Sequence, residues 1–392
     1  MEPRLAAPRD GASRREGRVK APASLGAMAA YFLRLGATGF GGPVALANAM
    51  RRDLVDGRSW LTESEYDAGL AIAAACPGPL AYQLGVYCGY VRHGVTGGLA
   101  VAVTFALAPF FLVVATAAAY ERFAASGPLR ALFYGVGPVV VALIVKAGWN
   151  LGRKTLRRDR VAWGFALVAG TVTVVLQEEL TALFLAAGVL GSIVFAPRSA
   201  PRGGGATVLA FAAPVGFAAG TTAKLFVFFF KTGCLVFGSG LVIVPFLKAY
   251  VVDQCHWLGD REFLDAVAVG MISPGPVVIT ATFVGYLVGG FAGALAATAG
   301  IFSPAVLFTI VATPLLVRHG KNARLQGFIR GVTVTVVGVL AGTTALVAQA
   351  AIGDALAAVA ALCALLVLAL RPNVPEPLLV AAGALAGLAA QR

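Results

Sequence analysis

Long apolar runs dominate the chain, and short polar stretches separate them. Runs long enough to cross a bilayer, at about 20 residues each, lie near 97–120, 128–150, 161–196, 206–230, 297–317, 328–350 and 354–370. They are continuous and rich in Ala, Leu, Val and Gly, whereas the strands of a membrane β-barrel alternate apolar and polar residues. The pattern therefore predicts an all-α polytopic integral membrane protein. Because several runs are short for a full crossing, we expect about 10 to 13 transmembrane segments.

Composition and charge support this class. Of the 392 residues, 59% are hydrophobic and 12% are charged, compared with roughly 25% charged in soluble domains. The net charge is +13, but the basic residues lie between apolar segments, where the positive-inside rule places them. We therefore expect the lipid bilayer, and no nucleic acid, as the partner of these charges. Residues 1–24 carry six Arg and Lys residues without a signal-peptide core and are predicted to form a basic cytoplasmic tail.

Residues that could bind a cofactor or catalyse a reaction are not grouped in any known pattern. The five cysteines are odd in number and mostly apolar in setting, so neither disulfides nor a zinc site is predicted. Cys255 and His256 are adjacent rather than spaced as metal ligands are. The sequence contains no redox-cofactor motif, no P-loop and no intramembrane cluster of carboxylates. We expect no cofactor, no metal and no enzymatic activity.

The sequence repeats itself at a shift of 197 positions. Phe40-Gly41 aligns with Phe237-Gly238, Trp60-Leu61 with Trp257-Leu258, and Pro77-Gly78-Pro79 with Pro274-Gly275-Pro276. Residues 31–79 and their partners give 13 identities in 49 pairs, and Arg34 aligns with Lys231. We predict two homologous transporter repeats, 25–196 and 222–390, joined by a linker at 197–221 that contains an extra transmembrane segment.

The basic clusters predict that the two halves face opposite ways. Arg153, Lys154, Arg157, Arg158 and Arg160 follow one long segment in the first half, whereas a second cluster, from Arg318 to Arg330, precedes its equivalent. If both clusters stay in the cytoplasm, equivalent segments run in opposite directions. This is an inverted repeat, the architecture of many secondary transporters. Inversion requires an odd number of membrane crossings between equivalent segments, and an extra crossing near 206–222 would supply it.

Glycine and proline interrupt the helices at matched positions. Residues 25–39 read as a helix, the run from Gly39 to Pro43 as a break, and 43–56 as a second half-helix; Cys76 to Pro79 forms the next break. Such a break is tolerated in a membrane where it is buried in protein or lines a wet cavity. Helix N-termini there bind anions through free N–H groups. Four converging breaks therefore predict an oxyanion site, although Gly and Pro could instead only kink or pack the helices.

Charged side chains near the breaks indicate the sign of the substrate. Arg34 lies five residues before the first break, and Lys231 repeats it. Cations within a membrane mark substrate pathways, although both could snorkel to the interface, as could Arg51 and Lys248. Glu65 and Glu262, also matched across the repeat, are candidates for proton coupling. Helix capping is the alternative for them and for the neighbouring carboxylates, Asp265 included.

Together these motifs resemble the chromate ion transporters, two-domain bacterial membrane proteins of chromate resistance. The resemblance rests on Phe40-Gly41-Gly42-Pro43, Trp60-Leu61-Thr62, Pro77-Gly78-Pro79 with Gln83, Gly89-Tyr90 and their second-half matches, among them Phe237-Gly238-Ser239-Gly240 and Gly285-Tyr286. It implies secondary export of chromate, or a related oxyanion such as sulfate, across the inner (plasma) membrane. The substrate-binding candidates are Arg34, Phe40, Gly41, Gly42, Pro43, Pro77, Gly78, Pro79, Gln83, Lys231, Phe237, Gly238, Ser239, Gly240, Pro274, Gly275 and Pro276.

Other functions remain open at this point. The alternatives are an oxyanion channel or a sulfate-type anion permease, because chromate and sulfate are both tetrahedral dianions of similar size. A counter-ion or a proton would drive a carrier, and the chain could pair as a homodimer. Chromate itself is inferred from the resemblance, whereas the negative charge of the substrate follows from the residues.

Overall fold

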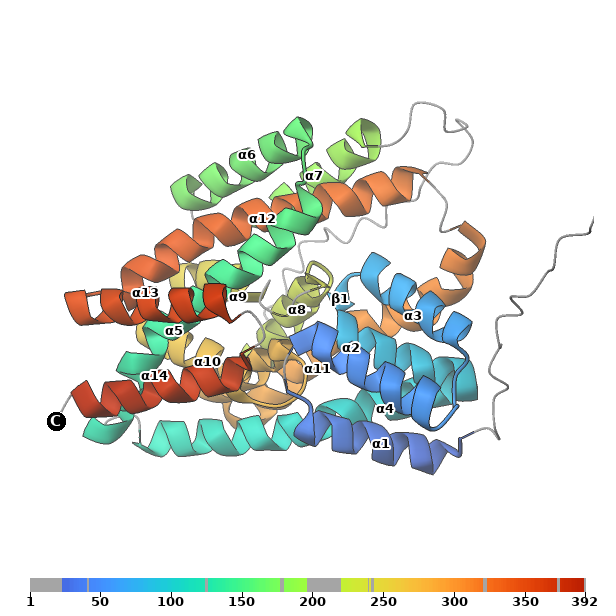
Figure 1. Ribbon diagram of the computed structural model, residues 1–392, viewed down its shortest axis with the longest axis horizontal. Coiled ribbons are helices and arrows are strands. Elements are labelled where there is room, and N and C mark those ends of the chain that lie inside the picture. The colour runs from blue at the N-terminus through green and yellow to red at the C-terminus, as the bar shows by residue number, and fades with distance from the viewer. Residues whose placement is uncertain are drawn as a thin grey trace, which may run out of the picture.

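The computed structural model is built almost entirely of helices (Figure 1). It describes residues 23–40, 42–123, 126–176, 180–195, 220–238, 240, 243–319, 323–371 and 374–390. Four predicted features lie outside these residues: Gly41, Ser239, the basic tail up to residue 22, and the 197–219 part of the linker with most of its extra segment.

The α-helices of the two halves correspond in order, whereas the two short strands lie at different breaks. The first half comprises α1 (Leu25–Thr38), α2 (Gly42–Met50), η1 (Arg51–Gly57), α3 (Glu63–Ala75), β1 (Gly78–Pro79), α4 (Leu80–Phe123), α5 (Gly127–Thr155), α6 (Arg160–Leu176) and α7 (Leu180–Val194). The second comprises α8 (Thr221–Gly233), β2 (Phe237–Gly238), α9 (Ile243–Phe246), η3 (Leu247–Gln254), α10 (Asp260–Ile272), η4 (Val277–Ile279), α11 (Thr280–His319), α12 (Ala323–Ala351), α13 (Ala355–Leu370) and α14 (Glu376–Ala390). The predicted all-α class and two-half organisation are confirmed.

The two longest helices, α4 and α11, are helical hairpins. In α4 the backbone leaves helical geometry at His93 and Gly94, and in α11 at Gly289 and Gly290. The Tyr82 hydroxyl donates a hydrogen bond to the Ala102 carbonyl at 2.9 Å, although 20 residues of straight helix would separate them by about 30 Å. The residues after the turn, 95–123, form an arm about 43 Å long, which covers the run predicted at 97–120.

The first two breaks are also turns between antiparallel helices. The Tyr31 hydroxyl on α1 donates to the Asp53 carboxylate on η1 at 3.0 Å, so the chain doubles back between them. At the matched positions of the second half, the Phe228 and Tyr250 rings stack with centroids 4.2 Å apart. The second break of each half is a similar turn, since α3 packs on α4 and α10 packs on α11. Each half therefore begins with two hairpins, and the breaks predicted from Gly and Pro lie at their tips.

Equivalent long helices pack against each other in opposite directions. Near one end of the α4–α11 contact Gly98 lies beside Ile310, and further along the Phe110 and Phe291 rings are 5.8 Å apart. The residue number rises along α4 while it falls along α11, so these arms are antiparallel. The pair α5 and α12 behaves in the same way, with Gly137 beside Ala351 and Gly148 beside Leu340. The predicted inverted repeat is confirmed.

The last hairpin of each half packs on the other half. Helices α6 and α7 lie along α12, and α13 and α14 lie along α5 (Figure 1). At the start of α6, Asp159 binds Arg330 of α12 at 2.7 Å. The Tyr134 hydroxyl of α5 donates to the carboxylate of Asp354, the N-cap of α13, at 2.7 Å. Because the exchange is reciprocal, neither half is packed as a separate body.

This exchange depends on close backbone contact, which gives a first prediction. A Cβ atom at Gly135 of α5 would overlap the Gly383 carbonyl of α14, and overpacking of this kind costs about 1 to 3 kcal/mol. We expect Gly135→Ala to lower the midpoint of thermal unfolding in detergent. Gly164→Ala is the matched control, since no atom lies within 4 Å of a Cβ there. Equal midpoints for the two variants would contradict the close packing of α5 on α14.

By length and composition, four of the described helical segments can cross a membrane. They are α4, α5, residues 277–311 of η4 and α11, and residues 326–351 of α12. The shorter apolar helices α6, α13 and α14 form hairpin arms. Since these arms are shorter than the about 20 residues of a full crossing, the predicted 10 to 13 crossings remain a prediction.

Candidate functional site

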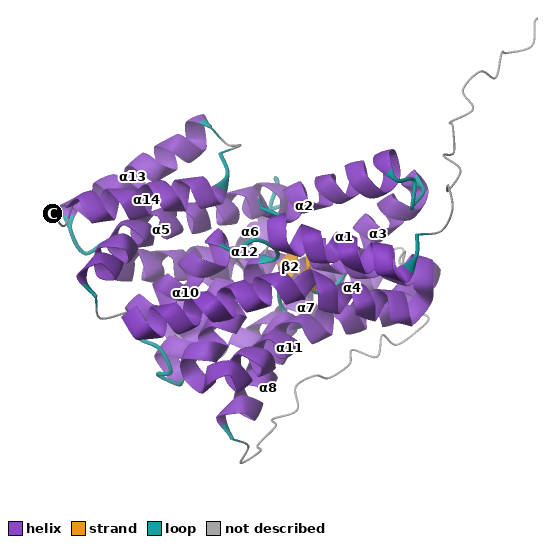
Figure 2. Cartoon of the chain, turned by 90° about the horizontal axis from the view of Figure 1, so that it is seen from below, coloured by secondary structure: helices purple, strands orange, loops and turns teal. Residues whose placement is uncertain are grey.

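The four breaks meet between the halves in two crossed pairs. Strand β1, from the second break of the first half, pairs in parallel with β2, from the first break of the second half. The Gly78 N–H donates to the Val236 carbonyl at 2.5 Å. At the matched positions the Gly275 N–H donates to the Gly39 carbonyl at 2.8 Å. Figure 2 shows β2 surrounded by helices near the middle of the molecule.

The two central glycines also pack reciprocally. A Cβ at Gly78 would lie 2.9 Å from the Ala305 Cβ of α11, and one at Gly275 would lie 3.0 Å from Pro109 Cγ of α4. Ala305 and Pro109 are equivalent under a shift of 196 positions. Both glycines have positive φ, +137° and +89°, a region that side chains rarely adopt. The breaks are therefore closely packed at the interface of the halves.

This pairing changes one expectation from the sequence. Free N–H groups were predicted at each break, but two of them, at Gly78 and Gly275, bind carbonyls of the opposite half. An anion could reach these two donors only after the crossed pairs separate. The breaks thus join the halves in this conformation, in addition to exposing helix ends.

The first break of each half can be described only in part. In the first half α2 begins at Gly42, with φ +77°, and Pro43 follows in its first turn, which suits proline. In the second half α8 ends at Gly233, Gly240 lies in a 3-10 turn, and α9 begins at Ile243, while residues 239, 241 and 242 lie outside the described residues. A glycine or proline at the helix start of this break therefore stays a prediction. Phe40, at the first break of the first half, is 48% exposed.

Gln83 is buried beside the second break. Its Nε2 donates to the Pro77 carbonyl at 2.7 Å, and its Oε1 is buried without a hydrogen-bond partner among the described residues. Thr280, at the matched position, donates from its hydroxyl to the Val277 carbonyl at 2.8 Å. Both side chains hold the chain at a break, and Gln83 retains one unused acceptor.

The cations predicted near the breaks have no acidic partners among the described residues. Arg34 is exposed, on the face of α1 opposite Phe32 and Leu35, which are buried. Lys231 is half-buried at the matched position of α8. Within the described part of the chain neither forms an ion pair. A cation without an acidic partner keeps its full attraction for an anion.

Arg51 and Lys248 are occupied instead in a repeated ion pair. Arg51 binds Glu63, and at the matched positions Lys248 binds Asp260 at 3.0 Å. Lys248 also binds Asp253. Both pairs join the second helix of a hairpin to the start of the next helix, so these cations have a structural role.

The matched glutamates lie at helix starts. Glu65 accepts a hydrogen bond from the Thr62 N–H at 2.8 Å and pairs with Arg92, which the sequence reasoning missed. Glu262 accepts from the Gly259 N–H at 3.0 Å. Both therefore cap their helices. Asp265 differs: it is 3% exposed within α10, so capping is the wrong interpretation for it.

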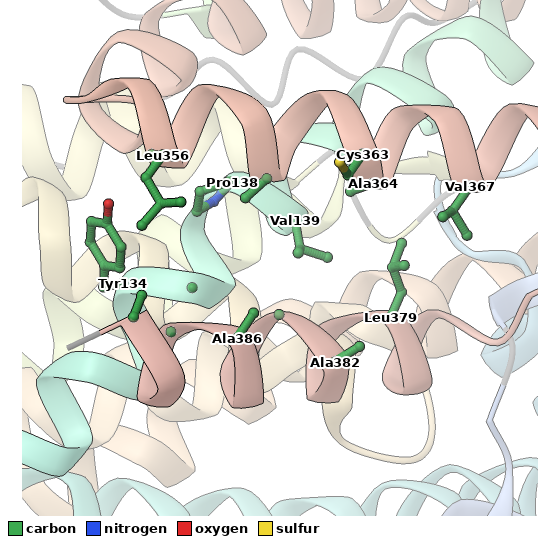
Figure 3. A pocket seen from close by; sticks show the side chains of 16 residues that line it. Tyr134, Pro138, Val139, Leu356, Cys363, Ala364, Val367, Leu379, Ala382 and Ala386 are labelled. Atoms are coloured by element: carbon green, nitrogen blue, oxygen red, sulfur yellow. The ribbon is translucent and has the colours of Figure 1, made fainter. Parts of the chain in front are cut away.

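A separate pocket lies away from the breaks, between α5, α13 and α14 (Figure 3). It has a volume of about 230 Å³ and is lined by apolar side chains such as Val139, Cys363 and Leu379, with Tyr134 at one end. None of the described residues that line it carries a charge. Its surface suits hydrocarbon, and an oxyanion would find no cation there.

Comparison with known proteins gives a consistent result. The family described as chromate transporter matches residues 26–192 and 223–388. A chromate transport protein of Cupriavidus metallidurans is 44% identical over 368 residues, 92% of each chain, and a probable chromate transport protein of Synechococcus elongatus is 40% identical over 93% of this chain and 95% of its own. A chromate transport protein of Pseudomonas aeruginosa is 34% identical over 84% of this chain and 83% of its own. No solved structure matches.

Proposed function

The chain belongs to the chromate transporter family, and from this premise we propose that it exports chromate as a secondary transporter. It is a multi-pass protein of the inner membrane, and its function is chromate transport. Export, rather than uptake, is the proposed direction. Transport without catalysis is part of the same proposal.

The crossed pairing of the breaks is the observation that supports a carrier. Inverted repeats allow alternating access when the two halves exchange conformations around a fixed site. In this conformation two N–H donors at the breaks, those of Gly78 and Gly275, bind carbonyls of the opposite half. An anion would reach them only when the halves move against each other. A carrier requires such a movement, whereas an open pore does not.

We propose that the oxyanion binds where the breaks meet. The residues predicted from the sequence remain the candidates, and Arg34 and Lys231 would supply the positive charge. Helix starts at the breaks add N–H donors, which favour anions. Those at Gly78 and Gly275 would become available as their bonds to the opposite half open.

Chromate and sulfate would compete at such a site. Both are tetrahedral dianions, and backbone donors with two cations provide little that tells one from the other. The proposal therefore includes sulfate as a competing substrate. Glu65 and Glu262 remain the candidates from the sequence for coupling to a proton or a counter-ion.

The predicted organisation of the chain forms part of this proposal. It consists of a cytoplasmic tail at 1–24, repeats at 25–196 and 222–390, and a linker at 197–221. A homodimer is compatible with transport, because each chain contains both halves and hence a complete set of breaks.

Flux measurements in proteoliposomes test the function. We expect saturable chromate uptake that is accelerated by chromate or sulfate on the opposite side, as exchange through a carrier requires. Everted vesicles should accumulate chromate if the direction is export. Large single-channel currents without counterflow would indicate a channel, and loss of total Cr(VI) would indicate an enzyme; either result would contradict the proposal.

A further inference from the structure

A buried carboxyl group connects the two halves outside the region of the breaks. Asp265, on α10 of the second half, is 3% exposed. It accepts a hydrogen bond from the hydroxyl of Tyr120, on α4 of the first half, at 2.7 Å. Tyr120 is itself buried, at 8% exposure.

The surroundings of this pair are apolar on the sides facing other elements. The Tyr120 ring packs edge-on against Phe133 of α5 and Phe283 of α11, with centroids 5.5 and 5.3 Å away. The charged groups that act on the Asp265 carboxyl are Arg261 and Glu262 of its own helix, one of each sign. No Lys or Arg forms an ion pair with Asp265 in the described part of the chain.

A carboxyl group in this setting is suited to binding a proton. Burying an ionised carboxylate is costly without a cationic partner, whereas its neutral form costs far less. A phenol offers one hydrogen bond and no charge. Ionisable groups with such surroundings in membrane proteins serve in proton relays.

We propose that Asp265, together with Tyr120, forms the proton-binding site that couples chromate transport to a proton gradient. This inference rests on the proposed function and names its coupling site. The carboxyl takes a proton from water on one side of the membrane and releases it on the other, and no other bond is made or broken.

The position of Asp265 links its protonation to the breaks. Helix α10 ends at Ile272, directly before Pro274-Gly275-Pro276, and Gly275 binds Gly39 of the first half. Movement of one half against the other would therefore separate Asp265 from Tyr120 and open this crossed pair together. The neutral carboxyl favours the packed arrangement, and the ionised one favours the arrangement that admits water.

The repeat does not duplicate this site. Ala68 and Leu316 occupy the positions matched to Asp265 and Tyr120. One chain therefore contains one such site, and we expect one proton to move per transport cycle through it. The asymmetry also distinguishes Asp265 from Glu65 and Glu262, which are matched and which cap their helices.

The test uses the full chain in proteoliposomes at zero membrane potential. Chromate uptake is measured with and without a pH gradient, and chromate self-exchange without one. We expect Asp265→Asn to lose stimulation by the gradient and to keep self-exchange. Asp265→Glu should keep the stimulation, and Tyr120→Phe should move the midpoint of the pH profile toward higher pH, because the carboxylate loses its donor. Asp67→Asn, an exposed carboxyl beside Ala68, is the control and should behave as the wild type.

The outcomes separate this inference from the proposed function. The inference would be overturned if the pH gradient fully stimulated chromate uptake by Asp265→Asn. It would also be overturned if Glu65→Gln or Glu262→Gln lost this stimulation while Asp265→Asn retained it. Wild-type chromate uptake that a pH gradient does not stimulate would overturn the inference as well, although chromate transport would then stand. If Asp265→Asn does not fold, an unchanged pH profile in Tyr120→Phe is the overturning result. Absence of chromate exchange by the wild type would overturn both.

Discussion

Replacing Gly78 or Gly275 with alanine is expected to reduce chromate transport by about tenfold or more, since each 1.4 kcal/mol is a factor of ten. Both residues have positive φ, where a side chain is strained by about 1 to 3 kcal/mol. A Cβ at Gly78 would also lie 2.7 Å from Gln83 Nε2 and 2.9 Å from Ala305 Cβ. The substitution would push the halves apart where their breaks are joined. The measurement is the initial rate of chromate uptake per reconstituted protein.

Variants at two other glycines serve as controls, because they introduce backbone strain without crowding at the interface. Gly94 and Gly290 have φ of +62° and +59°, but no atom lies within 4 Å of a Cβ at either. Gly94→Ala and Gly290→Ala should therefore lose some stability through strain and keep most of the transport rate. If all four variants lost transport equally, the crossed breaks would have no special part in it.

Neutralising Arg34 and Lys231 together is expected to lower kcat/KM for chromate by about tenfold or more, which corresponds to at least about 1.4 kcal/mol. Neither cation has an acidic partner in the described residues, so their charge is available to a dianion. The variants are Arg34→Gln and Lys231→Gln, singly and combined. Sulfate competition should weaken in parallel, because both anions carry the same charge.

The control for this prediction is Lys224→Gln. Lys224 is exposed on α8, two helical turns before Lys231 and further from the break. Its neutralisation should leave kcat/KM within about twofold of the wild type, because its charge lies about 10 Å further from the break, which is about one Debye length at 0.1 M salt. Unchanged transport of both anions by the Arg34→Gln/Lys231→Gln variant would remove these residues from the site.

The sequence predicted the elements of the site better than their contacts. Gly and Pro in apolar runs mark breaks by local chemistry alone, and the repeat at 197 positions with its basic clusters predicted opposite orientation. Pairing of Gly78 with Val236 could not be predicted, because a two-residue strand carries no pattern of its own. The exchange of α6–α7 and α13–α14 between halves depends likewise on tertiary contact.

The charged residues were predicted with mixed success. Arg51 and Lys248 are matched across the repeat, but their ion-pair partners could not be predicted, because only the folded hairpins bring each pair together. Asp265 was assigned to a cap because it lies near a helix start. Residues 263–270 are buried on every side, so its helix has no exposed face. A single carboxyl within such an apolar stretch was the signal that could have identified it.

The central claim is that the two halves face opposite sides of the membrane, so that their breaks meet in crossed pairs. Ser64 and Arg261 are equivalent, exposed positions at the starts of α3 and α10. The most direct test is labelling of single cysteines at these positions, in a background without the native cysteines, by a membrane-impermeant maleimide added to right-side-out or inside-out vesicles. We expect Ser64→Cys and Arg261→Cys to be labelled from opposite sides. Labelling of both from the same side would contradict it.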